Sequence, residues 1–283
     1  MAEARNHLIP GPEGRLSVRT KGLDARPEQV VIMVQGTNLS GQTGYDFQYG
    51  EGTTYSLLDA MVARGIGAVT FALSGYELSD PPADPLKVDT EHAIADFTAV
   101  MDWLAAEGYA KPSVLGWSWG GRISGHFTAR NPERVNRLVL LDPALGGGNL
   151  IIPGPTEPWW VNTREDYLKR LEPDFIDPAA HRAFIDHMLI HDIRAPNGVR
   201  VENAIGSKPV DPTQIQCPTL MIYGSAAARQ AYMQGGVVRA AFFETLPTKD
   251  KRFFIIPDGG DYGHLQNPRG QFHKAIADFL LDS

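Results

Sequence analysis

Short apolar runs alternate with longer amphipathic stretches along most of the chain. The short runs are rich in β-branched residues, which is typical of buried parallel strands, and they predict strands at residues 29–34, 67–72, 113–117, 137–141, 219–223 and 252–256. Apolar residues at helical spacing predict helices at residues 53–64, 89–107, 119–131 and 270–281. An earlier run, residues 15–20, predicts an antiparallel edge strand. This alternation is typical of an α/β fold with a mostly parallel central sheet and helices on both faces.

The alternation is interrupted once, between Leu141 and Thr219. The interrupting segment is rich in proline and glycine at its margins and contains two helical patterns, at residues 163–171 and 178–190. A segment of this length is too long for a plain connection. We therefore expect residues 144–211 to form an inserted helical lid, or cap, on a core made of residues 1–143 and 212–283.

A motif of the form G-x-S-x-G, with Ser118 at its centre, lies between a predicted strand and a predicted helix. On such a strained bend the serine hydroxyl projects from the carboxyl edge of the sheet, and Gly116 and Gly120 relieve the crowding. The amides at the start of the helix point to the same place, so the backbone N–H of Trp119 is the expected oxyanion donor. The motif therefore predicts a nucleophilic serine, and a turn that only tightens the packing of strand and helix is the alternative.

A base for this serine is predicted in the last loop. Of the eight histidines, only His264 lies in a glycine-rich loop between the last predicted strand and the last helix. An imidazole at that place can take the proton from Ser118 and return it to a leaving group. The alternative is an ordinary histidine of a surface loop.

With these motifs in this order, the chain resembles the α/β-hydrolase family over nearly its whole length. The resemblance implies a serine hydrolase with a lid, similar to esterases and lactonases. It also implies a second oxyanion donor in a loop that usually reads His-Gly followed by the donor. Here the loop has Gln35 in place of the histidine, followed by Gly36 and Thr37. The implied donor is the backbone N–H of Thr37, and the alternative is an ordinary turn after a buried strand.

The acidic member of the catalytic triad departs from the family pattern. A typical member carries Asp or Glu soon after the strand predicted at residues 219–223, but residues 224–229 of this chain contain no carboxylate. A histidine that gains a proton needs a carboxylate beside its other nitrogen. The best candidate is Asp142, at the end of the preceding strand, as in some α/β-hydrolases. Asp261 and Glu244 are weaker candidates, and capping of a turn is the alternative role for Asp142.

Several side chains are predicted to contact the substrate. Two tryptophans in the cap segment should close over an apolar ligand or over the core itself, because aromatic side chains are costly to leave in water. Aromatic residues near the nucleophile and in the loop after the oxyanion turn are candidates for the other walls. The predicted substrate contacts are Gln35, Tyr45, Trp117, Trp159 and Trp160.

Composition narrows the class of partner. The formal net charge of −7 and the pI of about 5.6 argue against a nucleic-acid partner. No apolar run reaches the length of a membrane span, and residues 1–10 lack the pattern of a secretory signal. The lone Cys217 rules out an internal disulfide. We expect a cytoplasmic protein with a small-molecule substrate, and a homodimer stays open.

No metal or cofactor is expected. His187 and His191 of the cap segment are four residues apart and share a helix face, with Asp192 following, which suggests a metal site. A third ligand is uncertain, however, and the predicted mechanism needs no metal.

The predicted reaction is hydrolysis of an ester or lactone of a small apolar or aromatic substrate through an acyl-enzyme. Hydrolysis of a carbon–carbon bond in a diketone-type substrate is the alternative with the same residues. A non-hydrolytic cyclase or isomerase, or a binding protein, also stays open, because one fold can carry many functions.

Overall fold

The computed structural model describes residues 3–50, 55–227 and 233–282. Within these residues, eight strands form one sheet in the order β1-β2-β4-β3-β5-β6-β10-β12. The strands β3 to β12 of this sheet run parallel to one another, and β1 and β2 are antiparallel. The predicted α/β fold with a mostly parallel sheet is confirmed. The strands are β1 (Arg5–Pro10), β2 (Arg15–Lys21), β3 (Val30–Val34), β4 (Gly67–Phe71), β5 (Ser113–Trp117), β6 (Leu138–Leu141), β10 (Thr219–Gly224) and β12 (Lys251–Ile256).

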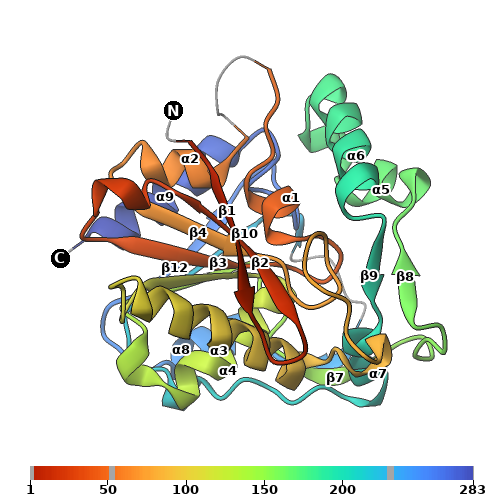
Figure 1. The fold of residues 1–283 in the computed structure, drawn as a ribbon. Helices are drawn as coiled ribbons and strands as arrows, with labels where there is room; N and C mark the ends of the chain where they lie inside the picture. The colour runs from red at the N-terminus through yellow and green to blue at the C-terminus, as the bar shows by residue number, and fades with distance from the viewer. Residues whose placement is uncertain (1–2, 51–54, 228–232, 283) are drawn as a thin grey trace.

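Helices cover both faces of the sheet (Figure 1). One apolar cluster joins the sheet to α3 (Thr90–Ala106), α4 (Trp119–Arg130) and α8 (Arg239–Thr245). A second cluster joins the other face to α1 (Gly41–Tyr45), α2 (Leu57–Val62) and α9 (Arg269–Leu281). Short 3-10 helices lie at Leu23–Ala25, Pro85–Lys87, Pro132–Arg134, Pro173–Phe175 and Pro212–Gln214. The carboxyl ends of the parallel strands therefore meet at one edge, between two helical layers.

Two elements of the first part of the chain differ from the prediction. The strand predicted at residues 15–20 is present and antiparallel, but it is not the sheet edge, because β1 lies outside it. In β1 only Ile9 is buried, so the strand has no apolar pattern from which it could be predicted. The helix predicted at residues 53–64 begins at Leu57, with the Ser56 hydroxyl accepting from the backbone N–H of Asp59. Residues 53 and 54 lie outside the described residues.

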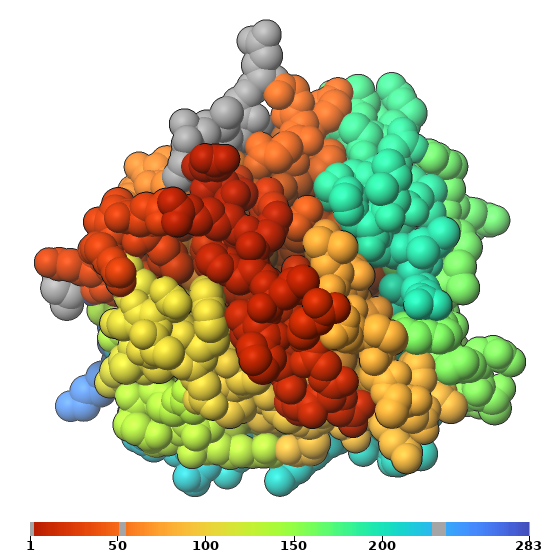
Figure 2. Space-filling view, viewed as in Figure 1, coloured from red at the N-terminus to blue at the C-terminus, as the bar shows by residue number. Residues whose placement is uncertain are grey.

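The cap segment, residues 144–211, contains both predicted helices, as α5 (Arg164–Arg170) and α6 (Pro178–His191). It also contains elements that the sequence pattern did not predict: β7 (Gly147–Leu150), β8 (Trp159–Val161), β9 (Arg194–Pro196) and α7 (Gly198–Ile205). β8 pairs with β9, and β7 pairs with β11 (Met233–Gly236), which follows β10 in the chain. In Figure 1, α5, α6, β8 and β9 stand beside the sheet, and Figure 2 shows the same green and teal segment along one side of the molecule.

Candidate active site

The turn between β5 and α4 places Ser118 in a strained conformation. Its backbone angles are φ 54° and ψ −116°, in a region that residues with a side chain rarely adopt. Its backbone N–H donates to Leu141 O at 3.0 Å, and Ala144 N donates to Ser118 O at 2.9 Å. The strained serine is thus tied to the end of the neighbouring strand β6, and its side chain lies at the carboxyl edge of the sheet.

The glycines of the motif allow α4 to approach the sheet closely. A Cβ at Gly116 would lie 2.2 Å from Gly120 O, and a Cβ at Gly120 would lie 2.1 Å from Val34 O. No real side chain tolerates such contacts with backbone atoms. Both positions therefore need glycine for the turn and helix to form.

The loop after β3 lies beside the nucleophile. A Cβ at Gly36 would lie 3.5 Å from Ser118 Cβ. The Tyr76 hydroxyl donates to Thr37 O at 2.6 Å and so fixes this loop. On the other side, Trp119 is the first residue of α4, so its N–H has no acceptor within the helix. The structure thus places Gly36, the residue before Thr37, and Trp119 next to Ser118, and the roles of Thr37 and Trp119 as oxyanion donors stay predictions.

The side chain of Gln35 is completely buried. Its Oε1 accepts from the backbone N–H of Leu73 at 3.0 Å, which joins the loop after β3 to the loop after β4. The side chain therefore supports the candidate oxyanion loop, and its role as a substrate contact stays a prediction.

His264 faces α1 in this structure. Its Nε2 lies 3.0 Å from Gly44 O, and because a carbonyl only accepts, this nitrogen carries the proton. The ring is completely buried against Trp117, and burial lowers its pKa to about 3. Within the described residues, no hydrogen bond joins His264 to Ser118 or to Asp142. The imidazole is therefore neutral, and burial disfavours its protonation in this position, so its role as the base stays a prediction.

Asp142 lies at the end of β6 with a fully buried carboxyl group. Its Oδ1 accepts from Arg239 Nη1 at 3.1 Å and its Oδ2 from the Gly224 backbone N–H at 3.4 Å. Burial first, and the nearby charge of Asp261 second, raise the pKa of Asp142 well above its ordinary value. Sequence reasoning missed Arg239, which lies 97 positions further along the chain and carries no local signal.

The last loop contacts the nucleophile's neighbour through Asp261. Trp117 Nε1 donates to Asp261 O at 2.8 Å, and Trp117 directly precedes Ser118. His264 lies further along, in a turn closed by the bond from Leu265 N to Tyr262 O at 2.7 Å. Asp261, a weaker candidate than Asp142 for the acid, is therefore a residue of this loop that contacts Trp117 and whose charge acts on Asp142.

The predicted aromatic contacts fall into two groups. Tyr45 and Trp117 are buried in the core, and the Tyr45 hydroxyl donates to Val34 O at 2.7 Å. Trp159 and Trp160 are half-buried in β8 and pack under guanidinium groups, those of Arg194 at 4.1 Å and Arg200 at 4.4 Å from the ring centroids. Their contacts with a substrate stay predictions.

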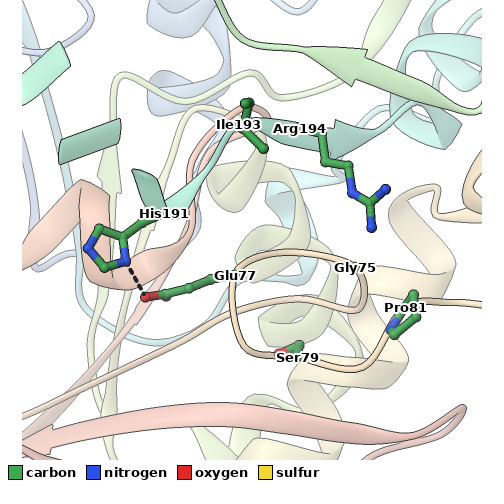
Figure 3. Close-up of a pocket in the computed structure, with 7 residues that line it drawn as sticks. All are labelled: Gly75, Glu77, Ser79, Pro81, His191, Ile193 and Arg194. Carbon is green, nitrogen blue, oxygen red and sulfur yellow. Dashed lines mark ion pairs between the residues drawn. The ribbon is translucent and has the colours of Figure 1, made fainter. Parts of the chain in front are cut away.

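A separate polar pocket lies between the cap segment and the loop after β4 (Figure 3). Its volume is about 230 Å³, and its lining includes Glu77 and His191, whose Oε1 and Nδ1 atoms are 3.6 Å apart. Burial raises the pKa of Glu77. The predicted site residues are not part of this lining, which consists of Gly75, Glu77, Ser79, Pro81, His191, Ile193 and Arg194.

Among the described residues, no group of three or more His, Cys, Asp or Glu side chains could hold a metal ion. No helix in the same part of the chain is long and apolar enough to cross a membrane.

A strained serine between a parallel strand and a helix, beside a loop able to supply a second amide donor, defines the nucleophile-elbow class of hydrolase folds. The family model for the alpha/beta hydrolase fold matches residues 30–184, more than half of the chain. This protein belongs to the alpha/beta hydrolase fold family.

Relatives of known activity are distant. A 2-hydroxy-6-oxononadienedioate/2-hydroxy-6-oxononatrienedioate hydrolase of Pseudomonas putida is 26% identical over 59% of this chain and 63% of its own length. A (lyso)-N-acylphosphatidylethanolamine lipase of Homo sapiens is 32% identical over 46% of this chain and 38% of its own. The chain thus matches less than two thirds of the length of these relatives.

Solved structures resemble the fold over nearly the whole chain. The enol-lactonase of Burkholderia xenovorans LB400 has a TM-score of 0.67 at 16% identity, over 98% of this chain and 100% of its own. The carboxylesterase CesB of Bacillus subtilis has a TM-score of 0.65 at 18% identity, over 99% and 92%. At these identities the likeness establishes the fold alone.

Proposed function

We propose that this protein is a serine hydrolase that cleaves an ester or lactone of a small apolar or aromatic substrate. The observation that carries the proposal is the strained Ser118 at the start of α4, with Trp119 directly after it and Gly36 of the loop after β3 beside it. A strained backbone at this place costs stability and is retained where it serves a reaction.

In the proposed mechanism, Ser118 Oγ attacks the substrate carbonyl as its proton passes to a base. The backbone N–H groups of Thr37 and Trp119 stabilise the oxyanion. The tetrahedral intermediate collapses, the base returns the proton to the leaving alcohol, and an acyl-enzyme remains. Water then attacks the acyl-enzyme with the same base, which releases the acid and restores the serine.

For the base we propose His264. Its ring must exchange the Gly44 carbonyl for the Ser118 hydroxyl, so catalysis needs a movement of the loop that precedes α9. Asp142 would support the base from the end of β6. Asp261 is the rival for the base, because its charge acts on the Asp142 carboxyl group and its carbonyl oxygen accepts from Trp117.

Hydrolysis of a carbon–carbon bond is the second candidate. It is favoured by the relatives that hydrolyse 2-hydroxy-6-oxo dienedioates, at 24% to 26% identity for the first three. Both reactions pass through the same elbow and oxyanion site. Turnover of a vinylogous diketone acid, with 1-naphthyl and p-nitrophenyl esters giving only one acylation, would favour this candidate over ester hydrolysis.

Replacement of the nucleophile tests the proposal. We expect Ser118→Ala to fold normally and to lose all turnover of p-nitrophenyl butyrate, together with labelling by a fluorophosphonate. Ser124→Ala is the matched control, because Ser124 is a buried serine of α4, the helix that follows Ser118. The control should keep both activity and labelling. An S118A protein that hydrolyses the ester as fast as the parent would contradict the proposal.

A further inference from the structure

Helix α7 of the cap segment is packed directly onto the core (Figure 1). A Cβ at Gly198, its first residue, would lie 2.4 Å from backbone atoms of Val88. Only glycine permits this approach. The helix therefore has a fixed position relative to the start of α3, which follows Val88 by two residues.

On one side, α7 reaches Trp119 through Thr90. The Thr90 hydroxyl donates to Glu202 Oε2 at 2.6 Å, and the Thr90 backbone N–H donates to the same oxygen at 3.1 Å. Trp119 Nε1 donates to the Thr90 hydroxyl oxygen at 3.0 Å. Because the single hydroxyl proton points to the carboxylate, the oxygen's lone pairs are free to accept from the indole. Glu202 thus orients Thr90, and Thr90 holds the side chain of Trp119.

Charge and burial support this chain of hydrogen bonds. Thr90 and Trp119 are almost completely buried, so an unmade bond there would leave a polar group without water. Arg122 of α4 lies 3.4 Å from Glu202 Oε2 and donates to Asn203 Oδ1 at 2.8 Å. The guanidinium balances the carboxylate and adds a second link between α4 and α7.

On the other side, α7 reaches the loop that carries Thr37. Arg200 Nη2 donates to the side-chain oxygen of Asn38, the residue after Thr37. Asn162, next to β8, donates to Asn38 O at 2.8 Å. The Arg200 side chain is itself held over the Trp160 ring. Two polar side chains of the cap segment, Arg200 and Asn162, therefore donate hydrogen bonds to this loop.

We propose that α7 is the positioning element of the oxyanion hole, acting on Trp119 through Glu202 and Thr90 and on Thr37 through Arg200 and Asn38. The inference rests on the proposed function, in which the backbone N–H groups of Thr37 and Trp119 are the oxyanion donors. An oxyanion donor works only when it lies about 2.7–3.1 Å from the developing charge, so small displacements of either amide weaken it. Glu202, Thr90 and Arg200 are positioning residues that touch no reacting atom.

A pair of substitutions at one position provides the test. Thr90→Val keeps the volume but removes the hydroxyl, and Thr90→Ser keeps the hydroxyl. We expect T90V to lower kcat for p-nitrophenyl butyrate about tenfold, a part of the roughly 10²–10³ that loss of a whole donor costs, with KM within twofold. The rate of fluorophosphonate labelling should fall by the same factor, and T90S should restore both.

Controls separate positioning from folding. Glu91→Gln breaks the exposed ion pair between Glu91 and Arg130, which also joins α3 to α4 but does not pass through Trp119. It should leave kcat unchanged. On the side of the loop that carries Thr37, Arg200→Lys removes the planar guanidinium group. It should lower kcat without raising KM. If T90V does not fold, Trp119→Phe takes its place in the same kinetic test. This substitution removes only the indole donor and part of the ring.

The outcomes distinguish the two proposals. If S118A keeps its activity, the proposed function fails and this inference fails with it. If S118A is inactive but folded T90V and R200K both retain the parent kcat and labelling rate, only the positioning role of α7 is overturned. A fall in kcat that T90S does not restore would also overturn it, because the hydroxyl would then not be the cause.

Discussion

At the scale of single residues, the protonation state of His264 bears most directly on the proposed chemistry. Its pKa is lowered to about 3 because the ring is buried, so the imidazole is neutral near pH 7. The pKa of Asp142 moves the opposite way, because burial and Asp261 both disfavour its charged form. Burial thus keeps His264 neutral and favours the protonated form of Asp142.

Replacing each candidate base by an uncharged residue distinguishes His264 from Asp261. We expect His264→Gln to lower kcat/KM about 10²-fold or more, as loss of a general base does, and Asp261→Asn to have a smaller effect. Pre-steady-state acylation by a p-nitrophenyl ester between pH 5 and 9 measures both variants. The reverse result, an active H264Q and an inactive D261N with an altered acid limb, would assign the base to Asp261.

At the scale of elements, the contact of α4 with β3 depends on the absence of a side chain at position 120. The added Cβ of a Gly120→Ala variant would meet Val34 O at 2.1 Å, an atom that belongs to the central sheet and cannot move away. The start of α4, with the amide of Trp119, would have to shift instead.

We therefore expect Gly120→Ala to lose about 1–3 kcal/mol of stability and most of the esterase activity, because an overpacked interior forces backbone shifts. Gly270→Ala is the control, because nothing lies within 4 Å of its added Cβ in α9. It should gain about 0.5–1 kcal/mol from the lower backbone entropy of alanine. Thermal unfolding monitored by circular dichroism measures both, and an unchanged midpoint for G120A would contradict the close packing.

At the scale of the whole molecule, the contact between α6 and the core contains a buried carboxyl group. Asp192 follows α6, and its Oδ2 accepts from the Ser40 hydroxyl at 2.9 Å. Burial raises its pKa to about 7, and Glu77 adds to the shift. Because the folded pKa is raised, this group stabilises the packing of α6 against the core at low pH, and the contribution is lost as the pH rises through about 7. His187 on α6 has a pKa lowered to about 4 and stays neutral above pH 6.5.

The packing of α6 against the core should therefore weaken between pH 6.5 and 8.5. Hydrogen exchange of the α6 amides, corrected for intrinsic rates, should show lower protection at the higher pH, and Asp192→Asn should remove that difference. Asp186→Asn changes an exposed residue of the same helix and should leave it in place. An identical pH dependence in D192N would show that another group is responsible.

The sequence predicts those features that depend on neighbouring residues. The parallel strands are found within two residues of their ends, because each is a short apolar run, and Ser118 is located by its own motif. β7, β9 and β11 are too short to show a pattern. The contacts of the candidate site join distant positions, as with His264 and Gly44, which are 220 residues apart. Side-chain orientation across such a separation is decided by packing and has no signature in the local sequence.

The pairing of β7 with β11 bears on how this scaffold can be re-engineered. β11 enters the chain after β10, outside residues 144–211, yet its register runs from Met233 opposite Leu150 to Gly236 opposite Gly147. A graft that exchanged only residues 144–211 for the lid of another hydrolase would strip this ribbon of one strand and expose its backbone. A successful chimera must carry both stretches from the same donor.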